Sequence, residues 1–358
     1  MQASDAPPER NDAEEKVETP VQDGGGENRK DWKRLLPGLI ISGISLAVVL
    51  YLAKPGRLYQ ALRLADYRLV LVALLFGFAW LAVRAMAWRT LLQNKAAFTP
   101  VFFTVNEGYL LNNVLPFRLG EVARAFLLSH KANLSFWEVI PSIIIERVLD
   151  LAFAAGLLLA TLPFVVGATW ARQAALGSAV IVLVGLLGLY LLASYRDWAM
   201  ALFHKLGQRW PAMLKVGGHS VEAFLKGLSV ITDGRLFLLA VFWILLDWLI
   251  ALGQYYLIMI AFIPQAKFLW TAFTLSASAL GIAAPSSPGA VGVYELVVVG
   301  ALALFGIQAA TALAFALTAH LSQYLLVGVL GTIGLARDGE SLIGVYSRVR
   351  RIPNQSSS

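Results

Sequence analysis

The chain has no cysteine and only four histidines among its 358 residues. Disulfides, thiolate metal sites and cysteine nucleophiles are therefore excluded, and the histidines are too widely spaced for a metal-ligand motif. Charged residues are also scarce, at 14% against about 25% in soluble domains. We expect no bound metal and no cofactor, and no nucleic-acid partner.

Hydrophobic residues, by contrast, make up 58% of the chain, and the mean hydropathy is +0.68. This composition is typical of integral membrane proteins, and it predicts an all-α polytopic membrane protein. A membrane-spanning helix needs about 20 apolar residues. Six segments meet this condition: Leu35–Ala53, Leu69–Leu92, Val139–Val166, Gln173–Ala193, Leu236–Ile263 and Ala309–Leu335.

The charge of the chain is unevenly distributed. Residues 1–28 hold eight acids and two bases, a charge of −6, which leaves +13 on the rest of a chain whose net charge is +7. We expect 1–33 to be a disordered acidic tail, 34–336 the membrane domain, and 337–358 a basic tail. The polar, acidic beginning does not resemble a cleavable signal peptide. The basic domain suits anionic head groups, although helix-end anchoring explains basic residues equally well.

Loop charges predict the sidedness. The linker 194–235 has six Lys or Arg and the C-terminal tail four, against one each in 164–175 and 263–267. This predicts a multi-pass protein of the cell membrane with both termini in the cytoplasm. Four bases between the first two spans contradict that scheme: Lys54, Arg57, Arg63 and Arg68. Within the linker, 198–232 mixes aromatic, apolar and basic residues, which predicts an amphipathic segment on the membrane surface.

Two apolar stretches are interrupted by polar residues, proline and glycine. They are 101–131 and 268–305, and we expect each to be a broken or re-entrant hairpin. Each lies at the same place within one half of the chain, and the halves have opposite predicted orientations. The pattern favours an inverted repeat with a binding site between the halves. The alternative is a helical bundle with two unrelated kinks.

The first interruption contains the motif Asn113-x-x-Pro116-x-Arg118-x-Gly120-Glu121-x-x-Arg124. Proline and glycine here predict a free helix N-terminus near Arg118, and unpaired N–H groups beside a guanidinium can bind phosphate. Glu121 and Arg124, three residues apart, could instead form an internal ion pair that makes their burial tolerable.

The following span contains Glu146, Arg147 and Asp150. Glu146 and Asp150 share one helix face, and Arg147 can reach Asp150. Charges inside a span indicate a polar pathway or a ligand site. The alternative is a self-neutralised cluster near the interface that holds the first hairpin in place.

The second interruption contains Pro285-x-x-Pro288-Gly289-x-x-Gly292-x-Tyr294-Glu295. Pro288 and Gly289 should leave backbone groups available to a ligand, with Tyr294 beside them. Glu295 is an isolated carboxyl that could carry a proton or bind a cation; the alternative is a structural strut to Arg118 or Arg147. Asp247, His320 and Gln323 are expected to make structural hydrogen bonds.

Taken together, these motifs resemble the flippase-like integral membrane family, also known as the transmembrane region of lysylphosphatidylglycerol synthases, over roughly residues 35–335. The resemblance implies movement of aminoacylated or glycosylated lipids between leaflets. About 22 residues follow Leu335, so we expect the soluble aminoacyl transferase domain to be missing.

We expect the partners to be membrane lipids, anionic or phosphate-bearing, with a membrane enzyme or a second copy of the chain as further partners. No catalytic residue is assigned. Two alternatives stay open: an intramembrane lipid-modifying enzyme using Glu121, Glu146 or Asp150 as acid or base, and a non-catalytic subunit for a separate glycosyl- or acyltransferase.

Overall fold

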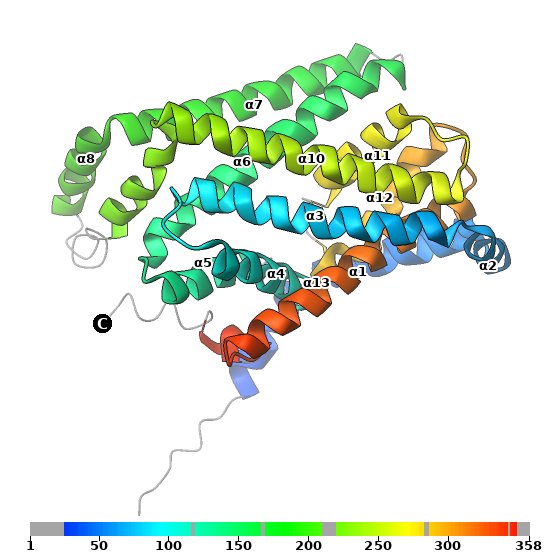
Figure 1. Cartoon of the computed structure of the whole chain (residues 1–358), viewed down its shortest axis with the longest axis horizontal. Helices are drawn as coiled ribbons and strands as arrows, with labels where there is room; N and C mark the ends of the chain where they lie inside the picture. The colour runs from blue at the N-terminus through cyan, green and yellow to red at the C-terminus, as the bar shows by residue number, and fades with distance from the viewer. Residues whose placement is uncertain are drawn as a thin grey trace, which may run out of the picture.

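The computed structural model describes residues 25–115, 119–165, 169–209, 220–282, 286–342 and 344–348. Within these residues the chain is helical and contains no strand (Figure 1). The first half contains α1 (Gly25–Ala53), α2 (Pro55–Leu64), α3 (Tyr67–Leu91), α4 (Phe98–Val114), α5 (Leu119–Ala132), α6 (Phe136–Thr161), η2 (Leu162–Phe164) and α7 (Thr169–Ser194). The second contains α8 (Arg196–Arg209), η3 (Leu228–Ile231), α10 (Gly234–Phe262), α11 (Phe268–Gly281), η4 (Pro288–Ala290), α12 (Val293–Ala303) and α13 (Ala309–Arg337).

Three helices in the described part of the chain are long and apolar enough to cross a membrane: α3, α10 and α13. A fourth candidate is α1 with α2, which meet at an angle of 77°. The bend follows from Pro55, which lacks the N–H that would continue the α1 ladder, and from Lys54, whose φ of 56° lies outside the helical region. The described residues therefore contain three or four candidate spans, as expected of a multi-pass membrane protein.

Two further predicted crossings, 139–166 and 173–193, correspond to α6 and α7. Charged residues interrupt the apolar sequence of α6, at Glu138, Glu146, Arg147 and Asp150. A span with this many charges needs partners from other helices. Six full crossings therefore stay a prediction.

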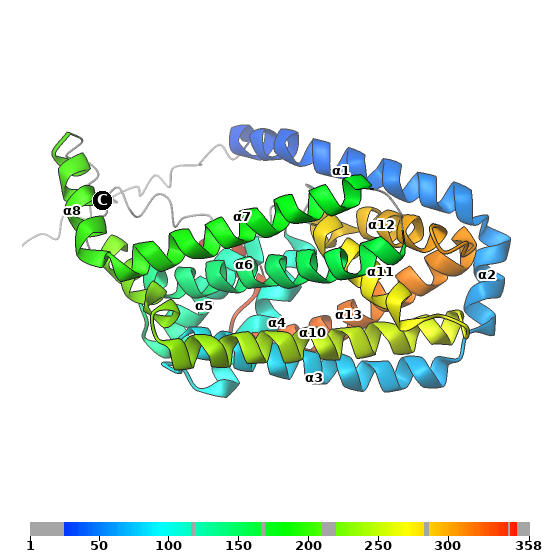
Figure 2. The ribbon, with the colours of Figure 1, turned by 90° about the horizontal axis from the view of Figure 1, so that it is seen from above.

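The helices pack as a bundle in which α3 and α10 run side by side along one edge (Figures 1 and 2). Small residues permit this contact: a Cβ at Gly77 would lie 2.8 Å from the Gln254 side chain, and one at Gly253 would lie 2.8 Å from the Phe76 ring. Close backbone approach is the usual basis of helix association in membranes. Figure 2 places α1 on the opposite side of the bundle from α3 and α10, with α2 crossing between them at one end.

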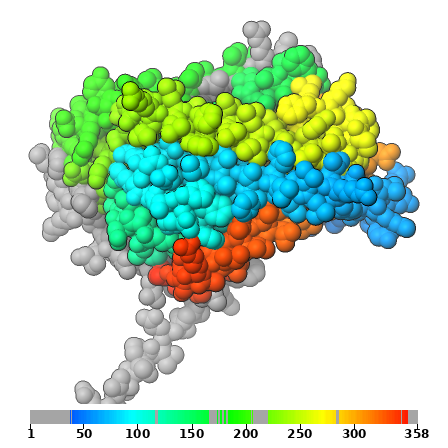
Figure 3. Space-filling view, viewed as in Figure 1, coloured from blue at the N-terminus to red at the C-terminus, as the bar shows by residue number. Residues whose placement is uncertain are grey.

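The outward faces of the long helices are apolar. Figure 3 shows α3, α10 and α13 together on one face of the molecule. Large apolar side chains are exposed along these helices, including Leu71, Leu75, Leu238, Leu321 and Leu325. Extended exposed apolar surface marks a membrane-facing surface.

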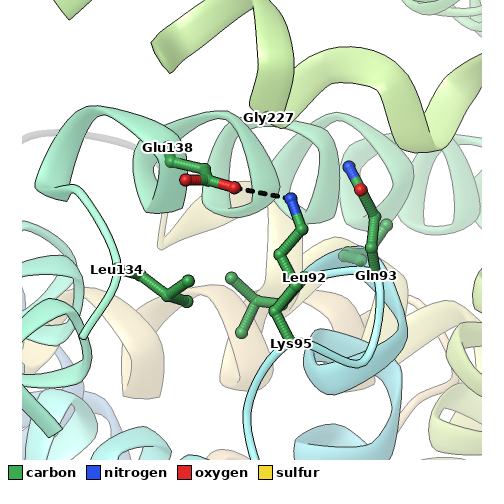
Figure 4. A pocket seen from close by; sticks show the side chains of 7 residues that line it. Leu92, Gln93, Lys95, Leu134, Glu138 and Gly227 are labelled. Carbon is green, nitrogen blue, oxygen red and sulfur yellow. Dashed lines mark hydrogen bonds and ion pairs between the residues drawn. The ribbon is translucent and has the colours of Figure 1, made fainter. Parts of the chain in front are cut away.

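Each interrupted stretch returns to the place where it began. Lys95, just before α4, lies 2.5 Å (Nζ to Oε1) from Glu138, just after α5 (Figure 4). In the second stretch, Trp270 near the start of α11 stacks on Phe305 after α12, with ring centroids 5.0 Å apart. Both stretches are thus helical hairpins whose two ends are neighbours.

The structure differs from two of the predicted boundaries. α1 begins at Gly25, so it includes residues predicted to belong to the acidic tail. The predicted surface segment 198–232 is only partly at the surface. Its last part is buried against α3, α6 and α10, because the apolar side chains of Leu225, Leu228 and Val230 fill the core there.

Candidate functional site

Arg84 of α3 is the centre of a buried charge cluster. Its guanidinium binds Asp150 of α6 through two nitrogens, Asp247 of α10 at 3.2 Å, and the Tyr109 hydroxyl of α4 at 2.9 Å. Its Nε also lies 3.3 Å from Glu146. An arginine in an apolar helix is stable only when such partners replace water. One side chain thereby joins four helices.

Arg124 of α5 forms the second part of the cluster. Its guanidinium binds both carboxylate oxygens of Glu146, at 2.6 and 3.2 Å, and both side chains are almost fully buried. The guanidinium also lies over the ring of Trp88, which donates a hydrogen bond of 2.9 Å to Ser142. This bidentate pair fixes α5 against α6.

Arg147 forms the open edge of the cluster. It binds Glu146, and it lies 3.8 Å from Glu121 and 3.5 Å from Asp150. The side chain is 34% exposed, whereas those of Arg84 and Arg124 are at most 5% exposed. Its Nε has no hydrogen-bond partner among the described residues, and neither does Oε2 of Glu121. Two buried polar atoms next to the exposed part of Arg147 therefore lack hydrogen-bond partners among the described residues.

The predicted ion pairs in this region are partly replaced by others. Glu121 is 3.9 Å from Arg124, but the close partner of Arg124 is Glu146. Glu146 and Asp150 do share a face, as predicted, and both contact Arg84. The cluster is not neutralised within α6 alone, because Arg84, Arg124 and Asp247 come from other helices. Arg118 and Pro116 lie outside the described residues.

The second interruption forms a tight turn held by side chains of α13. The Gly289 carbonyl oxygen accepts a hydrogen bond from the Tyr324 hydroxyl at 2.7 Å, and it lies 3.0 Å from Nε2 of His320. Gly289 has a φ of 68°, and a Cβ there would overlap the Tyr324 hydroxyl. Glycine is therefore required by both conformation and space.

Glu295 lies in the first turn of α12 and is buried. Its Oε2 accepts a hydrogen bond of 2.6 Å from the Gly292 N–H, and its Oε1 lies 2.6 Å from Nδ1 of His320. The prediction of an isolated carboxyl was wrong, since Glu295 is paired with His320. The predicted alternative partner Arg147 pairs with residues of the first half instead. The sequence pattern did not predict the pairing of Glu295 with His320, because the two residues lie on different helices.

The remaining predicted residues lie beside this turn. Tyr294 shares a hydrogen bond of 2.6 Å between hydroxyls with Tyr255 of α10, and its ring lies 4.5 Å from that of His320. Pro288 opens the short helix η4, which packs against α4. A Cβ at Gly289 would lie 3.5 Å from the carbonyl oxygen of Asn113. The two interruptions, far apart in sequence, thus meet.

Sequence reasoning missed Arg84 and a second cluster around Lys131. Lys131 of α5 lies 2.6 Å from the buried Glu107 of α4, and it also pairs with Asp338 after α13. The sequence feature that could have indicated Arg84 is its position as a cation inside an apolar segment, when another apolar segment contains the anion Asp247. In the described part of the chain, no three Asp, Glu or His side chains are placed to hold a metal ion.

Comparison with known proteins places these features in a family. A UPF0104 membrane protein of Methanothermobacter thermautotrophicus is 26% identical over 304 residues, covering 80% of this chain and 88% of that protein. A second UPF0104 membrane protein of the same organism is 21% identical over 327 residues, covering 85% and 95%. A glycosyltransferase of Haloferax volcanii, AglD, is 29% identical over 130 residues, or 34% of this chain and 20% of that protein.

No solved structure matches the chain significantly. The family described as the lysylphosphatidylglycerol synthase transmembrane region matches residues 35–331. That match runs from within α1 to within α13 and includes both interrupted hairpins, and the chain therefore belongs to this family.

Proposed function

We propose that the chain is a lipid transporter, which binds the head group of an anionic, aminoacylated or glycosylated lipid at the open edge of the charge cluster. The observation that carries this proposal is the guanidinium of Arg147, which is 34% exposed beside a largely buried network and has long contacts with Glu121 and Asp150 in addition to its close contact with Glu146. The buried carboxylates Glu146 and Asp247 already have Arg124 and Arg84 as partners. Arg147 can therefore turn its planar fork toward a phosphate without leaving a buried carboxylate unpaired.

The chemistry of the edge also suits a head group with more than one polar part. Glu121 and Asp150 are partly exposed beside Arg147, and Oε2 of Glu121 accepts no hydrogen bond from the described residues. Carboxylates at this position would accept hydrogen bonds from an amine or from sugar hydroxyls. A phosphate bound to Arg147 and a donor bound to Glu121 would together orient the lipid.

An inverted repeat would explain how such a site is reached from both leaflets. We propose that α3 to α6 and α10 to α13 are its halves. The packing supports this, because each contact has a counterpart: α4 packs on α13 and α11 on α6, α5 packs on α6 and α12 on α13. The spacing supports it too, since Glu121 precedes Glu146 by as many residues as Glu295 precedes His320.

In this proposal, α4–α5 and α11–α12 are re-entrant hairpins that enter from opposite sides and meet at Asn113 and Gly289. Broken helices of this kind are tolerated where they line a polar site. The protein lies in the cell membrane with both termini in the cytoplasm. The basic residues of α2, which contradict that sidedness, have another explanation: after a 77° bend, α2 can lie along the membrane surface.

A second candidate function is that of a non-catalytic subunit for a separate transferase. The observation that favours it is the similarity to part of a protein named as a glycosyltransferase. A lipid-modifying enzyme is less well supported, because Glu146 and Asp150 are held by arginines and are poorly suited to exchange protons.

The test is leaflet exchange by purified full-length protein in vesicles. Fluorescent lipids of several classes would be compared, namely anionic, aminoacylated, zwitterionic and polyprenyl-phosphate-linked. We expect one of the anionic, aminoacylated or polyprenyl-phosphate-linked classes to exchange faster than in protein-free vesicles. An excess of the same lipid without the fluorophore should slow that exchange. Equal, background exchange of every class would contradict the transporter, and chemical conversion of a lipid would establish the enzyme instead.

A further inference from the structure

The ring of His320 lies between two oxygens that both accept hydrogen bonds. Nδ1 faces the Glu295 carboxylate at 2.6 Å, and Nε2 faces the Gly289 carbonyl at 3.0 Å. A carbonyl oxygen has no hydrogen to give, so Nε2 must carry a proton for this contact to be a hydrogen bond. A second proton must lie between Nδ1 and Glu295, on either atom.

We propose that Glu295 and His320 form a proton-binding site, and that its occupancy decides whether His320 holds the Gly289 turn. This site goes beyond the head-group site at Arg147, and it supplies the regulation of the proposed transporter, on which its functional meaning rests. The ligand is a single proton exchanged with water. The responding element is the turn at η4.

The consequence of losing that proton follows from the hydrogen-bond inventory. A neutral imidazole has one N–H and one lone pair, so it cannot donate to both oxygens. The ionised carboxylate of Glu295 is the stronger acceptor and retains Nδ1–H. Nε2 then presents a lone pair to the Gly289 carbonyl, and that contact becomes repulsive. The turn keeps only the hydrogen bond from Tyr324.

The other described side chains around Glu295 and His320 carry no positive charge that could take the place of this proton. Tyr294 of α12 and Tyr324 of α13 place their rings 4.5 and 4.4 Å from that of His320. Tyr255 of α10 bonds to Tyr294 and lies near Ser278 of α11, while Ser42 of α1 accepts from the backbone of Ser287. Across the described ranges, no lysine or arginine pairs with Glu295 or His320. Among the described residues, His320 is therefore the basic partner of Glu295 at this turn.

The turn is connected to the first half of the bundle. Gly289 lies against the carbonyl of Asn113 at the end of α4, and α4 carries Tyr109, which bonds to Arg84 in the charge cluster. Release of the turn would therefore loosen the contact between the two hairpins. In this way the proton state at His320 would influence the head-group site.

Two readouts on the full-length protein in lipid bilayers test the site. Nitrogen-15 NMR of labelled histidine reports which ring nitrogens carry protons, and the His320 signal is the one missing in His320→Gln. Hydrogen exchange of the backbone at 286–293, corrected for the intrinsic effect of pH, reports the turn. As pH rises, we expect His320 to lose its Nε2 proton and the turn to exchange about fivefold faster, as for the loss of one hydrogen bond.

Glu295→Gln gives the sharpest comparison. An amide at this position donates to Nδ1 and still accepts from Gly292, so neutral His320 keeps Nε2–H on Gly289 and the turn should stay protected at every pH. His130→Gln is the matched control, because Nδ1 of His130 faces the Phe126 carbonyl without a carboxylate. It should leave the pH response unchanged.

A pH-independent turn in the wild type, or an unchanged pH response in Glu295→Gln, would overturn the proposal. These readouts need no lipid transport. A turn that titrates in a protein without leaflet exchange would therefore remove the proposed function and keep the proton site, whereas leaflet exchange in a protein whose turn does not respond to pH would do the reverse.

Discussion

The guanidinium carbon of Arg124 lies 4.1 Å from the centroid of the Trp88 ring. The same guanidinium is bound to Glu146, so the ring covers one face of an ion pair that water does not reach. A desolvated cation–π contact contributes about 2 kcal/mol. Trp88 is thus a main support of the charge cluster.

We predict that Trp88→Leu lowers the free energy of unfolding by about 3 kcal/mol, because it removes the ring, its hydrogen bond to Ser142 and buried volume. Trp88→Phe keeps a ring under Arg124 and should cost less than half as much. Thermal unfolding in detergent compares the two. Equal losses would mean that volume alone matters at this position.

Arg84 and Asp247 should be strongly coupled. Arg84→Gln leaves buried carboxylates without their cation, and loss of one partner of a buried pair costs about 3–5 kcal/mol. Asp247→Asn should cost less, because Arg84 keeps Asp150 and Glu146. The double variant should be more stable than the sum of the single effects predicts, and a double-mutant cycle on melting temperature measures this. Strict additivity would mean that the contact contributes nothing.

Arg147→Lys should weaken binding of a phosphate-bearing lipid about tenfold while the fold survives, because charge is kept and the bidentate fork is lost. Arg118→Lys should act in the same direction. Arg196→Lys is the control, since Arg196 pairs with Glu222 on the surface. Lipid binding to purified protein gives the comparison. Unchanged binding in Arg147→Lys and Arg118→Lys would make these cations structural counter-ions.

The ends of the first hairpin should label from the same side of the membrane. The chain has no native cysteine, so single cysteines can be placed at Asn94 and Asn133, which are both exposed and flank α4 and α5. An impermeant thiol reagent applied to one side of sealed vesicles should modify both or neither. Labelling from opposite sides would show that the hairpin crosses, and the repeat would fail with it.

Glu295 should distinguish an ionisable role from a structural one. Glu295→Gln keeps the hydrogen bonds to Gly292 and His320 but cannot ionise, so we expect normal thermal stability and a loss of transport of tenfold or more. Glu295→Ala should lose both, since the Gly292 N–H and His320 lose a partner. Transport and thermal stability are measured together. Full transport by the Gln variant would leave Glu295 only a structural strut.

The sequence was sufficient to predict the helices, because apolar length and proline or glycine interruptions are local features. α3, α10 and α13 lie within a few residues of their predicted positions. The bend at Pro55 was not anticipated, since proline is also tolerated at a helix start. The burial of Leu228 and Val230 was also missed, because an amphipathic pattern fits a membrane surface and a protein surface equally well.

The site residues were predictable as types but not as pairs. Glu146 and Arg147 stand out as charges in an apolar helix, whereas the contacts of Glu146 with Arg84 and Arg124 depend on how α3, α5 and α6 pack. The same holds for Glu295 and His320. A charge on one helix indicates that a partner exists somewhere in the bundle, and only the fold identifies it.

Synthesis of the chain must bring Arg84 into the membrane before its partners exist. Asp150 follows it by 66 residues and Asp247 by 163. At about 5–20 residues per second, the wait for Asp247 is on the order of ten seconds or more. Until Glu146 and Asp150 of α6 emerge, the Arg84 guanidinium of α3 is unneutralised and must remain near water or the insertion machinery; until α10 emerges, the cluster still lacks Asp247. The first half is therefore completed only by the second, and truncated chains ending before α10 should be substrates for membrane quality control.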